Sequence, residues 1–535
     1  MAFRINSSQQ LSLTDITNSL TLREQKALEN SWAKIFAEDI FPAIDEERFR
    51  ILYSDRTQSK FNTPVNICIG ALIIKEMFQI SDDEIVENLM LDPRYQYALH
   101  TTSFEEQPMS DKTLSRFRKR CYDYEQETGI DLIHDCVADL SGKIAKMMKI
   151  HPRIHRMDSL MIEANIKNLS RTELLYSCIA KLARRLHKLG RGDVLEGLEH
   201  YYDKNDFNRT FYYSNSTSTE DITQMLLRDA DTITGRCRDG LETQEEYRLL
   251  ERCLSEQTIV EGDTRRLREK KKDSFPKAMM QSPTDPDATY REKAGKKYRG
   301  YVANVEEAVD SNGSVIVDYQ FEQNIYSDSQ FLQDRLAGME QQEEGTVFVT
   351  DGAYCGESNT QAAQEKNIQL ITTALTGTEV PDIYADFEFS EDGSKILRCP
   401  MGNVPQSCCQ SSSNGHYYVS FPKEVCMNCP HKEECRVKEH KKVCSFTISL
   451  TAGYRAKAKR FMKTEEFSLL SRIRNGIETV PSVLRKIYHA DRMPVHGISR
   501  NRLFFGCKVA AFNVRKLFSY RNGWGHYAQN PLFAE

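Results

Sequence analysis

A strand-like segment carries a carboxylate where a buried strand would normally have none, and this constrains the fold most. Residues 154–165 (IHRMDSLMIEAN) are rich in Ile, Met and Leu between polar flanks, which predicts a β-strand. Hydrophobic and polar residues do not alternate cleanly, so we expect the strand to be covered on both faces. Burying an ionised carboxylate is costly. Asp158 therefore needs partners, either an arginine in the core or further groups that form a site.

Length and composition favour a large globular protein. At 535 residues the chain exceeds one ordinary core and predicts two to four structural units. Hydrophobic residues at 40% and charged residues at 28% exclude a disordered or fibrous chain. No apolar run reaches the roughly 18 residues that span a bilayer. The first residues, MAFRINSSQQ, lack the apolar core of a signal peptide, so we expect an intracellular protein.

Residues 21–150 show a helical pattern. Thr21 and Glu24 form a predicted capping box, and Ser81 precedes a second helix start. Ser110 is the expected cap of a later helix that carries four basic residues, Arg116, Arg118, Lys119 and Arg120. A short helix, a turn and a basic helix suit a helix-turn-helix contact with DNA. An ordinary helical bundle with an exposed basic face is the alternative.

The middle of the chain predicts a mixed α/β core with insertions. Residues 170–275 return to helix and close with the charge run TRRLREKKKD, which we expect to be a solvated helix end or a linker. Two strands then form a hairpin across Asp310–Gly313 (DSNG). A helix, the strand in TVFVTDGAY, and a further strand in EKNIQLITTAL follow. Strands separated by helices in this order are typical of an α/β core.

Three acids stand out by their positions. Asp158 interrupts one strand, Asp351 ends another, and Glu478 lies in a helical segment after Arg474. Ligand sites form outside strand ends in α/β sheets, where such acids can converge. Converging carboxylates repel one another unless a cation binds them, and oxygen ligands favour Mg²⁺ or Mn²⁺. Alternatively, Asp351 starts a plain turn, and Glu478 is an exposed residue paired with Arg474 four positions earlier.

Cysteine spacing predicts a structural zinc site. The chain has 15 cysteines, and Cys426-x-x-Cys429 with Cys435 and the upstream Cys399 has the spacing of four thiolate ligands. Four thiolates leave no open position for chemistry, so the zinc would be structural. Substitute ligands are Cys408, Cys409, His431 and His440. The alternative is a small loop domain with buried free thiols.

The C-terminal part is strongly basic although the whole chain has a net charge of −5. From Thr451 to Arg521 there are 16 Lys and Arg residues against four acids, a local net charge of +12. This predicts either a phosphate-binding surface, which would include Arg485 and Lys486, or a solvated helix face. Composition alone does not choose between them.

Several segments together resemble the DDE transposases of bacterial insertion sequences. The segments are MDSLMIEANIKNLSRTELLY, VTDGAYCGESN and RIRNGIE, in that order. They match an Asp-Ser in the first strand, a Thr-Asp-Gly-x-Tyr in a later strand, and an Arg-x-x-x-Glu on a late helix. Residues 89–120 also resemble the helical N-terminal domain of these proteins, and YREKAGKKYRGYVANV resembles the strand that precedes the second Asp.

The resemblance implies an RNase H-like mixed sheet and a division of the chain. Residues 1–150 would be a helical DNA-binding domain. Residues 151–375 and 448–535 would form the catalytic core, with a helical insertion at 168–280. Residues 376–447 would be a cysteine-rich, zinc-binding insertion. The sequence departs from the family near Gly476, where a bulky or charged residue is expected, so the helix start there should be looser than usual.

The resemblance also implies an activity. Asp158, Asp351 and Glu478 would hold two Mg²⁺ or Mn²⁺ ions, with Asp158 bridging them, and Arg474 would contact a phosphate or orient Glu478. The enzyme would cleave double-stranded DNA at the terminal inverted repeats and transfer the ends to target DNA. It would act as a homodimer or higher oligomer in the cytoplasm, at the nucleoid. A nuclease without strand transfer and a repurposed, non-catalytic DNA-binding protein are the alternatives.

Overall fold

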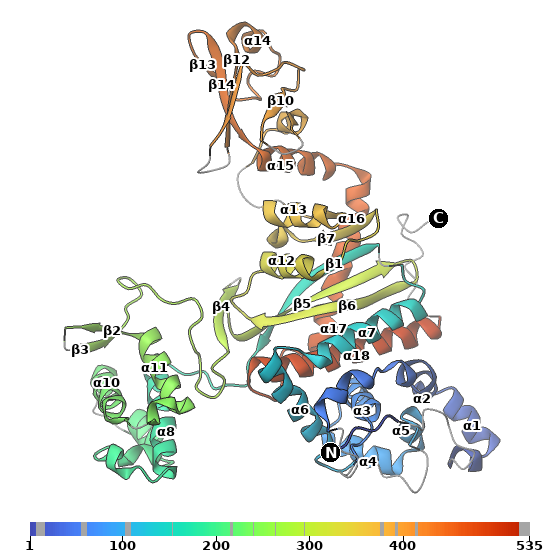
Figure 1. Ribbon diagram of the computed structural model, residues 1–535, viewed down its shortest axis with the longest axis vertical. Helices are drawn as coiled ribbons and strands as arrows, with labels where there is room; N and C mark the ends of the chain where they lie inside the picture. Colours follow the sequence, from blue (N-terminus) through green and yellow to red (C-terminus); the bar gives the residue numbers. More distant parts are fainter. Residues whose placement is uncertain are drawn as a thin grey trace.

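A central sheet with three surrounding parts makes up the protein (Figure 1). The computed structural model describes residues 1–6, 16–54, 61–101, 109–151, 153–213, 218–238, 240–262, 264–293, 295–374, 379–390, 394–411 and 416–523. Helices from the N-terminal third lie on one side of the sheet, a helical insertion lies beside it, and a cysteine-rich part lies at the far end. In this described part, no helix is long and apolar enough to cross a membrane.

The sheet combines antiparallel and parallel pairing. Its order is β6-β5-β1-β7-β8, with β4 pairing along the first residues of β5. Strand β1 is antiparallel to β5 and parallel to β7, and β8 continues the parallel side. This mixed order is consistent with an RNase H-like core. The strands are β1 (Ile154–Glu163), β4 (Thr289–Lys293), β5 (Lys296–Asp310), β6 (Gly313–Gln323), β7 (Thr346–Thr350) and β8 (Ile368–Thr372).

Strand β1 is covered on both faces, as its sequence predicts. Met157 packs in one cluster with side chains from α12 (Asp328–Gly338) and α13 (Glu357–Glu365). Leu160 and Ile162 belong to another cluster that includes α7 (Leu132–Met147) and α18 (Ile498–Arg521). Successive side chains of a strand point to opposite faces. Both faces of β1 are therefore shielded from solvent, so an ionised side chain in this strand carries a large desolvation cost.

The N-terminal helices share their core with α7, α18 and the sheet. The predicted capping box at Thr21 is present, and the predicted helix start at Ser81 is confirmed, with a capping box there as well. The expected cap at Ser110 is wrong, because the basic helix begins at Thr113 with Lys112 at its N-cap; Ser110 instead contacts the Thr113 hydroxyl. The helices are α1 (Leu22–Glu29), α2 (Trp32–Ile35), α3 (Val65–Phe78), α4 (Asp82–Leu91), α5 (Pro93–Ala98) and α6 (Thr113–Thr128).

The helical insertion between β1 and β4 has its own core, formed by α8 (Arg171–Lys188), α10 (Thr219–Arg236) and α11 (Glu245–Gln257). The expectation of a helix end or linker at the charge run is wrong for its first residues. They form β3 (Thr264–Leu267), paired with β2 (Thr258–Glu261). Arg265 pairs with Asp231, and Arg266 pairs with Glu261 and Asp273. These acids neutralise the charges, so the run can adopt a strand.

The cysteine-rich part is built on a small antiparallel sheet of order β11-β12-β14-β13. The next helix, α15 (Leu450–Phe461), returns toward the main sheet, and α16 (Glu465–Asn475) and α17 (Thr479–Lys486) run alongside it (Figure 1). The elements here are β9 (Glu388–Phe389), β10 (Ile396–Arg398), β11 (Ser407–Gln410), β12 (His416–Pro422), α14 (Lys423–Met427), β13 (Lys438–Glu439) and β14 (Val443–Ser449).

Much of the basic charge of the C-terminal helices is used inside the protein. Of the 16 basic residues from Thr451 to Arg521, nine form ion pairs with described acids. Lys508 on α18 and Glu76 on α3 are both nearly inaccessible, with side chains 6% and 7% exposed. A buried pair of this kind leaves a costly isolated charge when one partner is removed. The pair therefore fixes how α18 sits on the N-terminal helices.

We predict that Lys508→Met lowers the free energy of unfolding by roughly 2–4 kcal/mol, because Glu76 would lose its close cation and keep only the weaker contact with Lys75 at 4.0 Å. The double variant Lys508→Met/Glu76→Met should recover most of this loss. Urea unfolding followed by circular dichroism measures both values. The exposed Arg485→Met is the control and should change stability little. A Lys508→Met protein as stable as the parent would contradict the assignment.

Candidate active site

Asp158 and Asp351 come from neighbouring parallel strands. Arg156 of β1 is in register with Val349 of β7, and each acid lies two residues further along its chain. Asp351 follows the last residue of β7 and accepts a hydrogen bond from the backbone N–H of Ala353 at 2.8 Å. Asp158 accepts one from the N–H of Ser159 at 2.9 Å. The pairing of β1 with β7 thus brings the two carboxylates to one place on the sheet.

Arg474 joins these two acids to Glu478. Its Nη2 lies 3.5 Å from Asp351 Oδ2 and 4.0 Å from Asp158 Oδ1, and its Nη1 lies 2.7 Å from Glu478 Oε1. The arginine side chain is only 11% exposed, whereas that of Glu478 is 63% exposed. The structure therefore brings together all four residues singled out in the sequence. The alternative pairing of Glu478 with Arg474 is also present.

Burial dominates the electrostatics of Asp158. Burial raises the pKa of this carboxyl, Arg474 and the N–H of Ser159 lower it, and Asp351 raises it by a smaller amount, so that the pKa is about 6. The ionised form of Asp158 is thus destabilised by burial, and a single guanidinium does not fully compensate for this cost. Oxygen donors of this kind suit Mg²⁺ or Mn²⁺. As their side chains stand, no described His, Cys, Asp or Glu residues form a group of three or more that could hold a metal ion.

Arg156 positions the helix that carries Arg474, and its role was not predicted from the sequence. Its guanidinium is buried in an ion pair with Glu307 of β5, and its Nη1 donates to the carbonyl of Ile473 at 2.6 Å. A Cβ on Gly476 would lie 2.3 Å from that Nη1. Glycine is therefore required by the passing arginine. In the sequence, Arg156 could have been noticed as a second charged residue in the predicted strand of Asp158.

The expectation of a looser helix start at Gly476 is wrong. Gly476 has right-handed helical angles and directly follows α16. A short 3₁₀ turn over Gly476–Glu478 then leads into α17 without a break. The bond from Arg156 to Ile473 holds this junction. Arg474 and Glu478 therefore sit on a continuous helical segment.

The four predicted zinc ligands line one pocket, together with His431. Their thiols are close enough to affect one another: burial first, then Cys429, Cys399 and Cys426, raise the pKa of Cys435 to about 12. The buried Cys444 lies against Cys426 and was not expected from spacing.

The substitute ligands considered from the sequence are placed differently. Cys408 Sγ accepts a backbone hydrogen bond from Ile396, and Cys409 is exposed. His440 contacts the Ser445 hydroxyl. His431, which lines the thiol pocket, contacts Glu434. Of these four residues, only His431 lines that pocket.

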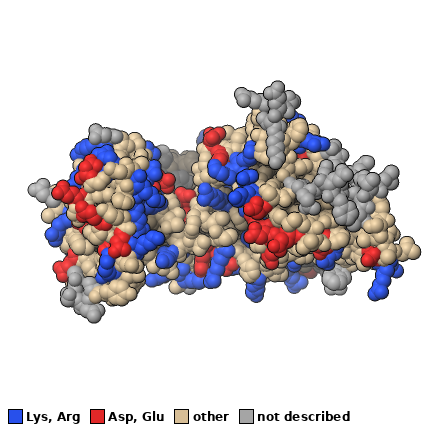
Figure 2. All heavy atoms as spheres, turned by 90° about the horizontal axis from the view of Figure 1, so that it is seen from below, with Lys and Arg blue, Asp and Glu red and all other residues tan. Residues whose placement is uncertain are grey.

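The basic residues proposed for DNA contact fall into two groups. Arg118 and Arg120 are engaged inside the protein, Arg118 with Asp82 and Arg120 with the carbonyl of Leu52. The others are exposed: Arg116 and Lys119 on α6, and Arg485 and Lys486 at the end of α17. Lys119 pairs with Asp123 one turn along the helix. Seen from below, Lys and Arg gather on the middle of the molecule and on the flank of the helical insertion that faces it (Figure 2).

The sheet order is consistent with an RNase H-like core, and two known families match parts of the chain. The family described as "Transposase DDE domain" matches residues 398–518, which include Arg474 and Glu478. "Transposase domain (DUF772)" matches residues 22–120, the N-terminal helices. Together the matches indicate a DDE transposase of the insertion-sequence type. Neither segment includes Asp158 or Asp351. No curated protein and no solved structure matches the chain.

We predict that Asp158→Asn stabilises the metal-free protein at pH 7.5 by ~1–3 kcal/mol. The pKa of Asp158 is raised to about 6 from 3.8, so folding favours its protonated form. The resulting penalty is absent below about pH 4, grows as the pH rises, and is complete above about pH 6. Urea unfolding in EDTA from pH 4 to 8 measures it. Glu163→Gln on the same strand should show no such dependence, and a destabilised Asp158→Asn at pH 7.5 would refute the assignment.

Proposed function

We propose that this protein is a DNA transposase that cleaves DNA at transposon ends and joins those ends to target DNA. The observation that carries the proposal is the gathering of Asp158 of β1, Asp351 at the end of β7, and Glu478 of the helical segment around Arg474. Three acids that share one arginine are a costly arrangement unless a ligand uses them. Phosphodiester chemistry with divalent cations is a use that suits this donor set.

In this proposal the three carboxylates hold Mg²⁺ or Mn²⁺. Bound divalent ions supply an activated nucleophile and stabilise the leaving 3′ oxygen of a phosphodiester. Asp158 and Asp351 are fixed by the sheet and keep their places. Glu478 is exposed and is the most adaptable of the three. Its position on a continuous helical segment lets a change of rotamer bring it toward the two aspartates.

Arg474 then has two roles. Without metal, its guanidinium offsets part of the repulsion among the three acids and keeps the site assembled. When cations bind these carboxylates, the guanidinium is free to contact a DNA phosphate, for which its planar donors are well suited. Its Nε is buried and has no hydrogen-bond partner among the described residues. A ligand reaches that donor only if the guanidinium turns, and no hydrogen bond from the Nε to a described residue is lost when it does.

The DNA partner would lie over the exposed basic residues. Arg116 and Lys119 on α6 and Arg485 and Lys486 on α17 can contact phosphates, because they face solvent. Arg118 and Arg120 would support α6 and not read DNA themselves. A homodimer or higher oligomer on double-stranded DNA completes the proposal, since two transposon ends must be joined in one event.

The triad is tested by removing one charge at a time. Asp158→Asn, Asp351→Asn and Glu478→Gln should each lower both end cleavage and strand transfer by at least about 10³-fold, because each removes a ligand. DNA binding should be nearly unchanged. Cleavage and joining of labelled duplexes bearing the element's ends measure the two steps separately. Cleavage without joining by the parent protein would indicate a nuclease.

The matched control for the triad is Glu163→Gln, which changes an acid of the same strand as Asp158 outside the cluster. It should keep near-parental activity. If Glu478→Gln also cleaves at the parental rate, Glu478 is not a ligand. Exposed acids at the start of α16, Glu465 and Glu466, would then be tested next.

We also propose that Cys399, Cys426, Cys429 and Cys435 hold a structural zinc ion, since all four line one pocket and thiolates are the donors zinc prefers. Elemental analysis of reduced protein should find about one zinc per chain. Cys429→Ser should lose the metal and lower the melting temperature, because bound zinc contributes folding free energy. Cys409→Ser, an exposed neighbour, should keep it. Folded, reduced protein without zinc would overturn the proposal.

A further inference from the structure

The turn that follows Asp351 directs a tyrosine to the far face of the sheet. Gly352–Tyr354 form a short 3₁₀ turn, and Tyr354 is fully buried in the apolar cluster that contains Met157 and residues of α12 and α13. Successive side chains of a strand point to opposite faces, so Met157 and Asp158 lie on opposite faces of β1. The Tyr354 ring therefore lies on the face of β1 that is opposite to the Asp158 carboxylate.

The hydroxyl of Tyr354 reaches strand β5. In the sheet order β5-β1-β7, strand β1 lies between β5 and the strand that leads to Tyr354. The Tyr354 hydroxyl accepts a hydrogen bond from Nδ2 of Asn304, a buried residue of β5. Asn304 is in register with Ser159, the residue after Asp158. The tyrosine thus crosses β1 at the level of Asp158 and links the strands on its two sides.

The backbone of the same turn is fixed by α12, α13 and the end of β8. Asn359 of α13 is fully buried, and its Nδ2 donates to the carbonyl of Tyr354 at 2.9 Å and to the carbonyl of Ser329 at 3.0 Å. A Cβ on Gly352 would lie 2.8 Å from the carbonyl oxygen of Ala374, so the turn packs directly against the chain that follows β8. The turn is therefore held both at its backbone and at the tyrosine hydroxyl.

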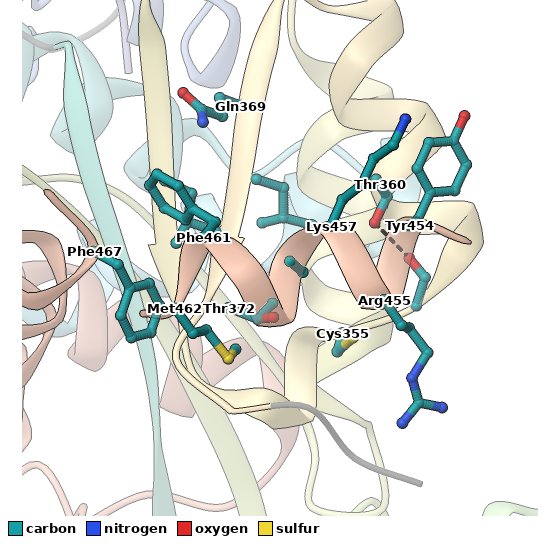
Figure 3. Close-up of a pocket in the computed structure, with 14 residues that line it drawn as sticks. Cys355, Thr360, Gln369, Thr372, Tyr454, Arg455, Lys457, Phe461, Met462 and Phe467 are labelled. Carbon is teal, nitrogen blue, oxygen red and sulfur yellow. Dashed lines mark hydrogen bonds between the residues drawn. The ribbon is translucent and has the colours of Figure 1, made fainter. Parts of the chain in front are cut away.

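The other side of this segment borders a pocket. Cys355, the residue after Tyr354, lines a pocket between β8 and α15 (Figure 3). The hydrogen bond visible there joins the Thr360 hydroxyl to the carbonyl of Gly356, both at the start of α13, at 3.0 Å. This bond is local and does not connect the segment to α15. The contacts that relate the turn to the strands β1 and β5 are thus those of Tyr354.

We propose that Tyr354 is a positioning residue that, together with Asn304, sets the place of Asp351 relative to Asp158. The inference rests on the proposed function, because it takes these two carboxylates to bind a divalent cation. Asp158 lies within β1, whereas Asp351 follows the last residue of β7 and its side chain is 35% exposed. The hydrogen bond between Tyr354 and Asn304 supplies the constraint that Asp351 lacks. Removing a group that orients a metal ligand lowers metal affinity by roughly 10–100-fold.

The test measures the Mn²⁺ affinity of the whole chain without DNA, by isothermal titration calorimetry. Tyr354→Phe keeps the ring in the apolar cluster and removes only the hydroxyl, so it should weaken Mn²⁺ binding about tenfold. Asn304→Leu removes the donor of the same hydrogen bond and should weaken binding by a similar factor. Because both changes delete one interaction, the double variant should lose no more affinity than either single variant.

Two further readouts separate positioning from a general loss of stability. In EDTA, the N–H of Ala353, which donates to Asp351, should exchange with solvent at least about threefold faster in both single variants. In DNA cleavage, Tyr354→Phe should need about tenfold more Mn²⁺ for half-maximal rate. At saturating Mn²⁺ its kcat should stay within about threefold of the parental value, because the concentration then compensates for the weaker site.

The matched control is Tyr201→Phe in the helical insertion. Tyr201 is fully buried in a separate core and its hydroxyl donates to Asp229, so the change deletes the same kind of bond away from the acids. This variant should keep the parental Mn²⁺ affinity and the parental exchange at Ala353. If Tyr354→Phe fails to fold, as judged by its melting curve, Asn304→Leu compared with the same control decides.

Three results would overturn the proposal. The first is parental Mn²⁺ affinity in folded Tyr354→Phe or Asn304→Leu. The second is a pair of losses that multiply in the double variant, since the two residues would then act independently. The third is an equal loss of affinity in Tyr201→Phe, because lowered stability would then account for the effect.

Failure of the proposed function is distinguishable from failure of this inference. A parent protein that binds Mn²⁺ but cleaves no DNA would sink the transposase activity and leave the role of Tyr354 standing. Cleavage of transposon ends by the parent, with parental Mn²⁺ affinity in both variants, would do the reverse. If the parent binds no Mn²⁺, the metal assignment of the proposed function fails, and the exchange at Ala353 in EDTA decides the inference.

Discussion

The buried ion pair of Arg156 and Glu307 is the interaction on which the site depends. It links β1 to β5 across the antiparallel side of the sheet, and both side chains are almost fully shielded from solvent. The same guanidinium donates to the carbonyl of Ile473, one residue before Arg474. A single side chain thus relates the strand of Asp158 to the helix of Arg474 and Glu478. Loss of Glu307 would remove the carboxylate that balances the buried Arg156, and loss of Arg156 would leave Glu307 with the more distant Lys516, 3.7 Å away.

This arrangement explains why the acids can be gathered before any cation binds. Three carboxylates at one place would repel one another, and Asp158 already has a raised pKa because it is buried. Arg474 offsets the repulsion, but it reaches the acids only because Arg156 fixes α16 at its last turn. Gly476 is part of the same arrangement, because a Cβ at this position would lie 2.3 Å from Arg156 Nη1. The site is therefore pre-assembled by two arginines of different function.

Local sequence motifs predicted the helix starts and the hairpin. The geometry of the candidate active site, in contrast, depends on contacts between residues far apart in the sequence. The capping box at Thr21, the helix start at Ser81 and the hairpin at Asp310–Gly313 follow from residues three or four positions apart, and all three were predicted correctly. Ser110 failed as a cap because its side chain contacts Thr113 and the helix begins later. Arg156 could not be assigned from sequence, because its partners lie about 150 and 317 residues away.

The count of basic residues in the sequence overestimates the DNA-binding surface, because long-range ion pairs use some of these charges. The excess of +12 from Thr451 to Arg521 suggests one continuous DNA-binding surface, yet Lys508 is buried against Glu76 and Arg521 pairs with Asp39. Those charges attach α18 to the N-terminal helices. The cations that stay exposed lie in short stretches, such as Arg485 and Lys486. A salt-dependent DNA contact would therefore involve fewer phosphates than the sequence excess suggests, with specificity left to base contacts and DNA shape.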